Sequence, residues 1–125
     1  MSFTRQRLWQ LLGAASEAPA RAVATSIEAR AGYGVERLRL ETAGGETVRG
    51  ILTRPATESG RLPAIFYMHS HGGHYAVGAD ERLKGQDYIG ARGPVLAQAC
   101  YVTLSIDMPL FGERRQFTES ALSKA

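Results

Sequence analysis

The pattern of apolar and polar positions predicts a β-hairpin followed by a strand–helix–strand unit. Between residues 35 and 54, two strand-like segments flank the glycine-containing turn 43–46, which is typical of a hairpin. Two later segments, 62–68 and 101–107, are mainly apolar, as expected for strands buried on both faces of a parallel sheet. Residues 93–99 begin with a Gly-Pro pair and predict the crossover helix between them.

Two helices are expected before the hairpin. Residues 4–13 have leucines and a tryptophan at helical spacing, with Thr4 as a candidate N-cap, and we expect their apolar face to pack on the domain. Residues 19–31 begin with a proline and are followed by glycines, which predicts a second helix. The chain would then consist of a helical segment, 1–34, and an α/β core, 35–125.

The composition is that of an ordinary globular protein. Hydrophobic residues make up 44%, charged residues 22% and the net charge is +3, so neither disorder nor nucleic-acid binding is expected. A single cysteine, Cys100, excludes an internal disulfide, and its context predicts a small buried side chain at a helix end. No apolar stretch has the length of a membrane span or a signal peptide, so we expect a cytoplasmic protein without a membrane partner.

The strongest candidate for chemistry is the His/Gly loop, residues 69–74, with the sequence His69-Ser70-His71-Gly72-Gly73-His74. It follows an apolar segment directly, and open α/β sheets bind their ligands at the carboxyl ends of strands. Neighbouring glycines also let a ligand come close to the backbone. The charged segment 75–92 that follows is typical either of the rim of a binding site or of a flexible loop.

The order of these features resembles the first half of an α/β-hydrolase, most of all the dienelactone hydrolase and acetyl-xylan-esterase branch. The matching residues span nearly the whole chain: 7–13, 63–73, 96–97, 101–104 and 107–114. The resemblance implies a partial α/β-hydrolase fold, with an antiparallel hairpin leading into a parallel sheet. It also implies a serine hydrolase that cleaves small carboxylic esters or lactones and uses no cofactor.

In such an enzyme, the loop after the third strand supplies backbone N–H groups to an oxyanion hole, which binds the oxygen that gains charge during attack. The resemblance gives this role to His71 and Gly72, and a loop-supporting role to His69, Gly73 and Asp107. The Gly-x-Ser-x-Gly motif that holds the serine nucleophile does not occur in the sequence. We therefore expect a truncated enzyme, inactive alone, whose nucleophile, acid and base lie outside these residues.

Two alternatives remain open. The spacing His69-x-His71-x-x-His74 resembles the metallo-β-lactamase signature, in which imidazoles hold a zinc ion that activates water, although Gly73 stands where that signature has aspartate. The chain could instead be a non-catalytic module. In that case its last strand, 101–107, would be an apolar open edge, which favours self-association.

Overall fold

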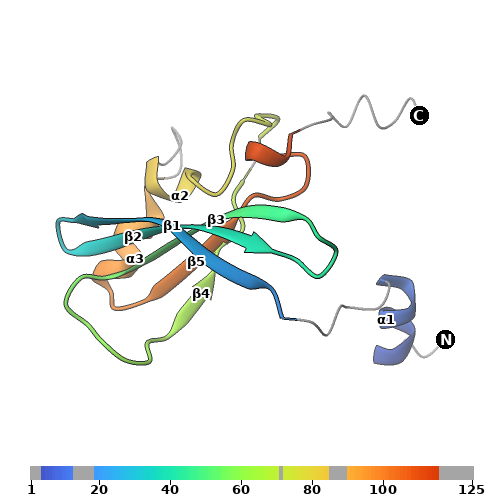
Figure 1. Ribbon diagram of the computed structural model, residues 1–125, viewed down its shortest axis with the longest axis horizontal. Coiled ribbons are helices and arrows are strands. Elements are labelled where there is room, and N and C mark those ends of the chain that lie inside the picture. Colours follow the sequence, from blue (N-terminus) through green and yellow to red (C-terminus); the bar gives the residue numbers. More distant parts are fainter. Residues whose placement is uncertain (1–3, 13–18, 71, 85–89, 116–125) are drawn as a thin grey trace.

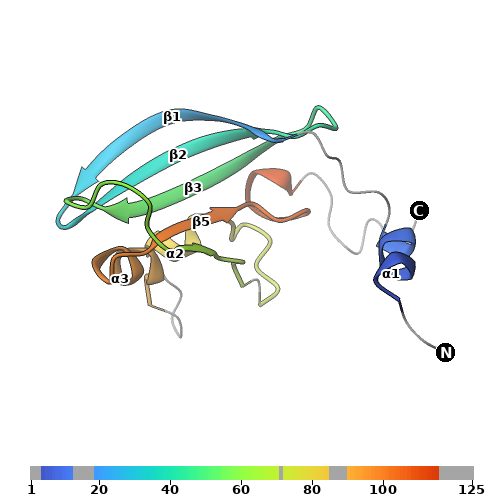
Figure 2. The ribbon, with the colours of Figure 1, turned by 90° about the horizontal axis from the view of Figure 1, so that it is seen from below.

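The computed structural model describes residues 4–12, 19–70, 72–84 and 90–115. Within these ranges five strands form one mixed sheet in the order β1-β2-β3-β5-β4, and two short helices, α2 and α3, lie on the same face of it (Figures 1 and 2). The strands are β1 (Arg21–Arg30), β2 (Tyr33–Glu41), β3 (Thr47–Pro55), β4 (Ala64–Phe66) and β5 (Val102–Ile106). The helices are α1 (Arg5–Leu12), α2 (Glu81–Lys84) and α3 (Arg92–Gln98), with a 3-10 turn, η1 (Gly112–Arg114).

The predicted hairpin is confirmed by β2 and β3. The two strands pair antiparallel from Tyr33 opposite Pro55 to Glu41 opposite Thr47. Gly45, in the connecting turn, has a φ of 78°, a left-handed conformation that glycine adopts without steric cost. The turn therefore follows from a local sequence signal.

The second expected helix is wrong, because its residues form strand β1. Val23, Thr25 and Ile27 recur at every second position, and their branched side chains favour extended backbone. Gly32, with a φ of 79°, closes a tight turn, so that β1 pairs antiparallel with β2. The strand pairing outweighs the helix signals. In the described part of the expected helical segment, residues 1–34, α1 is the helix that forms.

Helix α1 confirms the first expected helix but not its packing. The Thr4 hydroxyl accepts a hydrogen bond from the Arg7 N–H at 3.3 Å, as an N-cap does. Leu8, Trp9 and Leu11 are 43%, 48% and 61% exposed, and α1 lies away from the sheet in both views (Figures 1 and 2). The expectation that this face packs on the domain is therefore wrong for this chain.

Strands β4 and β5 pair in parallel, and α3 separates them in the sequence, which confirms the predicted strand–helix–strand unit. Two expectations about burial are wrong. Strand β5 lies between β3 and β4, so residues 101–107 do not form the open edge. The described open edge on this side is β4, where Phe66 is 57% exposed, so this strand is not buried on both faces.

The core combines a small apolar cluster with buried polar groups. Val35, Ile51 and Ala79 form the cluster. Beside it Arg82, 1% exposed, donates hydrogen bonds to the Ile51 carbonyl, the Thr53 hydroxyl and the Thr103 carbonyl at 2.7–3.2 Å. None of these partners is charged, and burial lowers the pKa of Arg82 to about 10. The contacts attach α2 to β3 and β5.

Two smaller findings complete the fold. Cys100 is exposed and has a φ of 62°, so it ends α3 as expected but is not the buried side chain that its context predicted. No helix in the described part of the chain has the length and apolar character needed to cross a membrane.

We expect the exposed β4 edge to cause self-association of the isolated chain. Phe66→Ser removes an exposed apolar side chain, so it should lower the associated fraction several-fold, while the free energy of unfolding changes by less than about 0.5 kcal/mol. Sedimentation velocity over a range of concentrations measures the first quantity and urea unfolding the second. Ile27→Ser, at an exposed position on the opposite edge strand, is the matched control. Equal association of wild type and Phe66→Ser would contradict the expectation.

Candidate functional site

The candidate site forms where β4 and β5 end side by side. The segment after β4 contains the His/Gly loop, and the segment after β5 contains residues 107–115. The two segments contact each other directly, because Gly112 N–H donates to the carbonyls of Tyr75 and Val77 at 3.0 and 3.1 Å. The rings of Tyr75 and Phe111 stack with centroids 5.1 Å apart. Parallel pairing of the strands thus brings both loops to one edge of the sheet.

The carboxylate of Asp107, which is fully buried, joins both segments to β3. It accepts two hydrogen bonds from the guanidinium of Arg49, from Nε and Nη2, each at 2.9 Å. It also accepts the backbone N–H groups of Ala79 at 2.7 Å and Glu113 at 2.8 Å. Hydrogen bonds to a charged acceptor are the stronger kind, so these contacts hold three separate segments together.

Arg49 carries further ion pairs. Its guanidinium lies 3.4 Å from Asp80 and 3.7 Å from Glu113. Burial alone would lower the pKa of Arg49, but the hydrogen bonds and charge of Asp107, with the charges of Asp80 and Glu113, outweigh it and raise this pKa above its ordinary value. The guanidinium is therefore a permanent positive charge at the base of both segments.

Two glycines make room for the Asp107 carboxylate. A Cβ atom on Gly78 would collide with Asp107 Oδ1 and would lie 2.8 Å from Arg49 Nη2. A Cβ atom on Gly112, whose φ is +57°, would collide with all three carboxyl atoms of the same side chain. The sequence shows two ordinary loop glycines, and only the fold shows what they accommodate.

His69 is 5% exposed and uses both ring nitrogens within the protein. Nε2 accepts the Met108 N–H at 3.2 Å, so the proton is on Nδ1, which donates to the Ser70 carbonyl at 2.9 Å. The ring also meets Phe111 edge to face, with centroids 5.5 Å apart. Since the N–H and the lone pair of this neutral ring are both engaged, the imidazole joins the two loops and has no free nitrogen for a zinc ion.

Ser70 is held by the buried carboxylate of Glu81. Its backbone N–H donates to Glu81 Oε2 at 2.8 Å, and its hydroxyl makes a short hydrogen bond to Glu81 Oε1. The Tyr67 hydroxyl donates to Oε2 at 3.4 Å. Burial, together with the charge and hydrogen bond of Glu81, raises the pKa of Tyr67, so this hydroxyl remains a donor at neutral pH.

The glycines of the loop are exposed. Gly72 and Gly73 have φ values of 48° and 81°, and no described residue accepts a hydrogen bond from the Gly72 N–H. The expected oxyanion residue His71 lies outside the described residues, and His74 is exposed. Among the residues that the structure describes, no three His, Cys, Asp or Glu side chains form a group suited to a metal ion.

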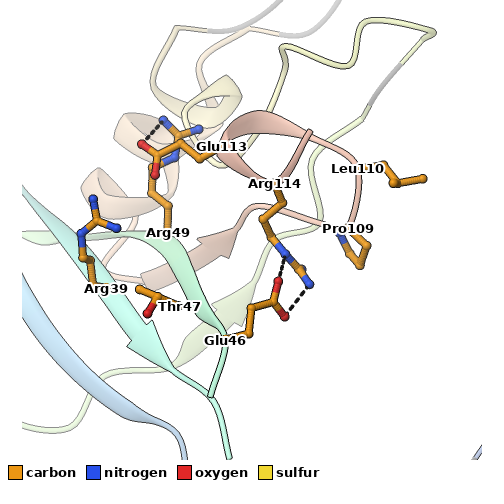
Figure 3. Close-up of a pocket in the computed structure, with 8 residues that line it drawn as sticks. All are labelled: Arg39, Glu46, Thr47, Arg49, Pro109, Leu110, Glu113 and Arg114. Carbon is orange, nitrogen blue, oxygen red and sulfur yellow. Dashed lines mark hydrogen bonds and ion pairs between the residues drawn. The ribbon is translucent and has the colours of Figure 1, made fainter. Parts of the chain in front are cut away.

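A charged cleft of about 430 Å³ is lined by residues of β2, of β3 and its preceding turn, and of the 109–114 segment. Its lining includes Glu46, Arg49, Glu113 and Arg114 (Figure 3). Arg114 binds the Glu46 carboxylate with Nε at 2.7 Å and Nη2 at 2.8 Å. Arg39 also lines the cleft, so three arginines stand against two glutamates, and no described residue of the His/Gly loop lines it.

Sequence reasoning missed Arg49, Glu81 and the two glycines that contact Asp107. Glu81 and Arg82 stand in a segment rich in charges, which indicated an exposed loop, yet both are buried. Their partners lie 11 or more residues away in the sequence. No local pattern predicts the hydrogen bonds of Glu81 and Arg82. A run of charged residues close together in the sequence instead favours an exposed loop.

Two comparisons relate the chain to proteins that are described as hydrolases. No family model matches the chain. Over 123 residues it is 35% identical to YtaP of Bacillus subtilis, a protein provisionally named a hydrolase; the match covers 96% of this chain and 41% of YtaP. A crystal structure from Bacteroides fragilis, provisionally described as an acetyl xylan esterase, has a TM-score of 0.65 at 18% identity and covers 90% of this chain and 30% of that one. The chain thus spans less than half the length of either protein.

The collision with Asp107 predicts a stability loss for two alanine variants. Gly78→Ala and Gly112→Ala should each lower the free energy of unfolding by about 1–3 kcal/mol, as overpacked sites do. Gly90→Ala is the control, because no atom of the described residues lies within 4 Å of a Cβ atom there, and it should change stability by less than about 0.5 kcal/mol. Urea unfolding measures all three. Equal stability of the three variants would show that the carboxylate has room to move.

The ion pairs of Asp80 predict a pH dependence. Burial alone would raise its pKa, but the hydrogen bond from Lys84 and the charges of Arg49 and Lys84 lower it below its ordinary value. The unfolded chain then binds the proton at a higher pH, near 3.9. The stabilisation of the folded state by the ion pairs of Asp80 is therefore present above about pH 4 and is lost as the pH falls through the folded-state pKa.

The melting temperatures of wild type and Asp80→Asn, measured by circular dichroism, should therefore differ by a constant amount above about pH 5 and converge below about pH 4. A difference that grows as the pH falls would contradict this assignment.

Proposed function

We propose that the chain is the oxyanion-hole half of a serine hydrolase that cleaves small carboxylic esters or lactones. The observation that supports this most is the Gly72 N–H, which stands in an exposed turn at the carboxyl end of β4 and meets no described acceptor. A backbone donor held in such a place would stabilise the oxyanion of an attacked ester, and removing one typically costs about 3 kcal/mol of transition-state stabilisation.

Several features agree with this proposal. His69 and Asp107 are engaged in hydrogen bonds that join the two loops, so they serve as loop supports and not as the base or the acid. Gly73, with its positive φ, lets the turn bring Gly72 to the surface. His71 would add a second N–H by its position next to Gly72. The name of YtaP and the description of the Bacteroides fragilis protein agree with ester hydrolysis.

The remaining catalytic groups would come from a longer protein. The sequence lacks a nucleophile motif, and this chain corresponds to 41% of the length of YtaP. In the proposed reaction a serine attacks the ester carbonyl, the alcohol leaves and water then hydrolyses the acyl-enzyme. The zinc alternative receives no support from His69, since both of its ring nitrogens are engaged.

A fluorophosphonate probe tests the proposal. The protein isolated from its native source should have a mass above 13.5 kDa and gain one probe adduct, because the probe reacts with an activated serine. The isolated 125-residue chain should gain none and should not hydrolyse p-nitrophenyl acetate. The control is the protein from the native source after heat denaturation, which leaves no activated serine. Absence of an adduct on active native protein would contradict the proposed serine chemistry.

A further inference from the structure

We propose that Glu81 is the positioning residue of the oxyanion loop, an inference that rests on the proposed function above. Its carboxylate is 2% exposed and binds both hydrogen-bond donors of one loop residue, the backbone N–H and the hydroxyl of Ser70. Ser70 stands two residues before Gly72. Fixing Ser70 therefore fixes the direction in which the chain enters the glycine turn.

Glu81 itself is held on both sides. Two residues before it, the Ala79 N–H binds the buried Asp107 carboxylate at 2.7 Å. One residue after it, Arg82 binds the Thr53 hydroxyl at 2.7 Å and the Thr103 carbonyl at 3.0 Å. The neighbours of Glu81 thus attach it to β3 and β5. Because Glu81 is held against the sheet, it can hold Ser70 in a fixed position.

The chemistry of the contact fits a positioning role better than a structural one. Among the described residues, the hydrogen-bond partners of the Glu81 carboxylate are the neutral donors of Ser70 and Tyr67, and burying a carboxylate without a cation is costly. Two neighbouring glycines lose more conformational entropy on ordering than other residues do. A buried carboxylate that binds two donors of Ser70 can hold the turn at Gly72 and Gly73 in one conformation.

The loop has a second support that acts at a different place. His69 binds the Met108 N–H with its ring, which joins the start of the loop to the segment after β5. Glu81 acts one residue further on, through Ser70 and from the side of α2. Loss of Glu81 should therefore loosen the glycines without separating the two segments.

Hydrogen exchange on the 125-residue chain tests the positioning directly, without any need for catalysis. In Glu81→Gln the Ser70 amide, which donates to this carboxylate, should exchange about tenfold faster than in wild type, and the Gly72 amide should have a lower NMR order parameter, while the Ile51 amide of β3 should be unchanged. Glu28→Gln, which removes a carboxylate on β1 at the opposite edge of the sheet, is the matched control and should leave all three amides unchanged. Unaltered exchange at Ser70 together with an unaltered order parameter at Gly72 in Glu81→Gln would overturn the proposal.

Kinetics on the protein of native length test the consequence. Because an oxyanion hole acts in the transition state, Glu81→Gln should lower kcat for p-nitrophenyl acetate by about 10- to 100-fold, with KM within about twofold. Ser70→Ala should lower kcat by a smaller factor, and Ser70→Thr, which keeps the hydroxyl, should restore it. This pair decides the question if Glu81→Gln does not fold.

The outcomes separate the two proposals. Ester turnover that Glu81→Gln and Ser70→Ala leave unchanged would overturn the role of Glu81 and leave the proposed function intact. No turnover by wild type, with faster exchange in Glu81→Gln, would refute the hydrolase proposal and retain Glu81 as the residue that holds the loop. A probe adduct on Ser70 itself would make Ser70 the nucleophile and overturn the positioning role.

Discussion

The arrangement of both loops depends on one buried carboxylate, that of Asp107. Its two hydrogen bonds to Arg49 connect residues 58 positions apart in the sequence, and its bond to the Ala79 N–H connects residues 28 positions apart. A buried carboxylate without a partner is strongly destabilising, so the folded state must keep these donors in place. Gly78 and Gly112 leave room for the carboxylate and for no side chain of their own.

A second buried carboxylate, that of Glu81, extends this order to the His/Gly loop. Asp107 holds the base of the segments after β4 and β5, and Glu81 holds Ser70, close to the glycines. Both carboxylates accept hydrogen bonds from backbone N–H groups, and these bonds orient the backbone of the residues that donate them. Since these bonds occupy the carboxylates, neither is available as the acid of a catalytic triad. In the proposed hydrolase, these residues therefore support the loops, and the bond-making groups come from residues outside them.

The sequence predicts those elements whose signals are local. The β2–β3 hairpin follows from its glycine turn, and α3 follows from the Gly-Pro pair at its start. Strand β1 was predicted as a helix because of the proline before it and the glycines after it, and pairing with β2 overrides these signals. The position of β5 inside the sheet and the burial of Glu81 and Arg82 depend on distant partners. The glycine loop was recognisable from the sequence, but its supports, apart from His69 and Asp107, were not.

Native-state hydrogen exchange at the Ala79 and Glu113 amides tests the central claim most directly. Both N–H groups point at the Asp107 carboxylate, although both belong to loops. If this carboxylate holds the loops, the two amides should exchange as slowly as the amides of β3, which lie in the middle of the sheet. If they exchange as fast as the amide of Gly60 in the exposed loop before β4, while β3 remains protected, Asp107 does not hold the loops and the account is wrong.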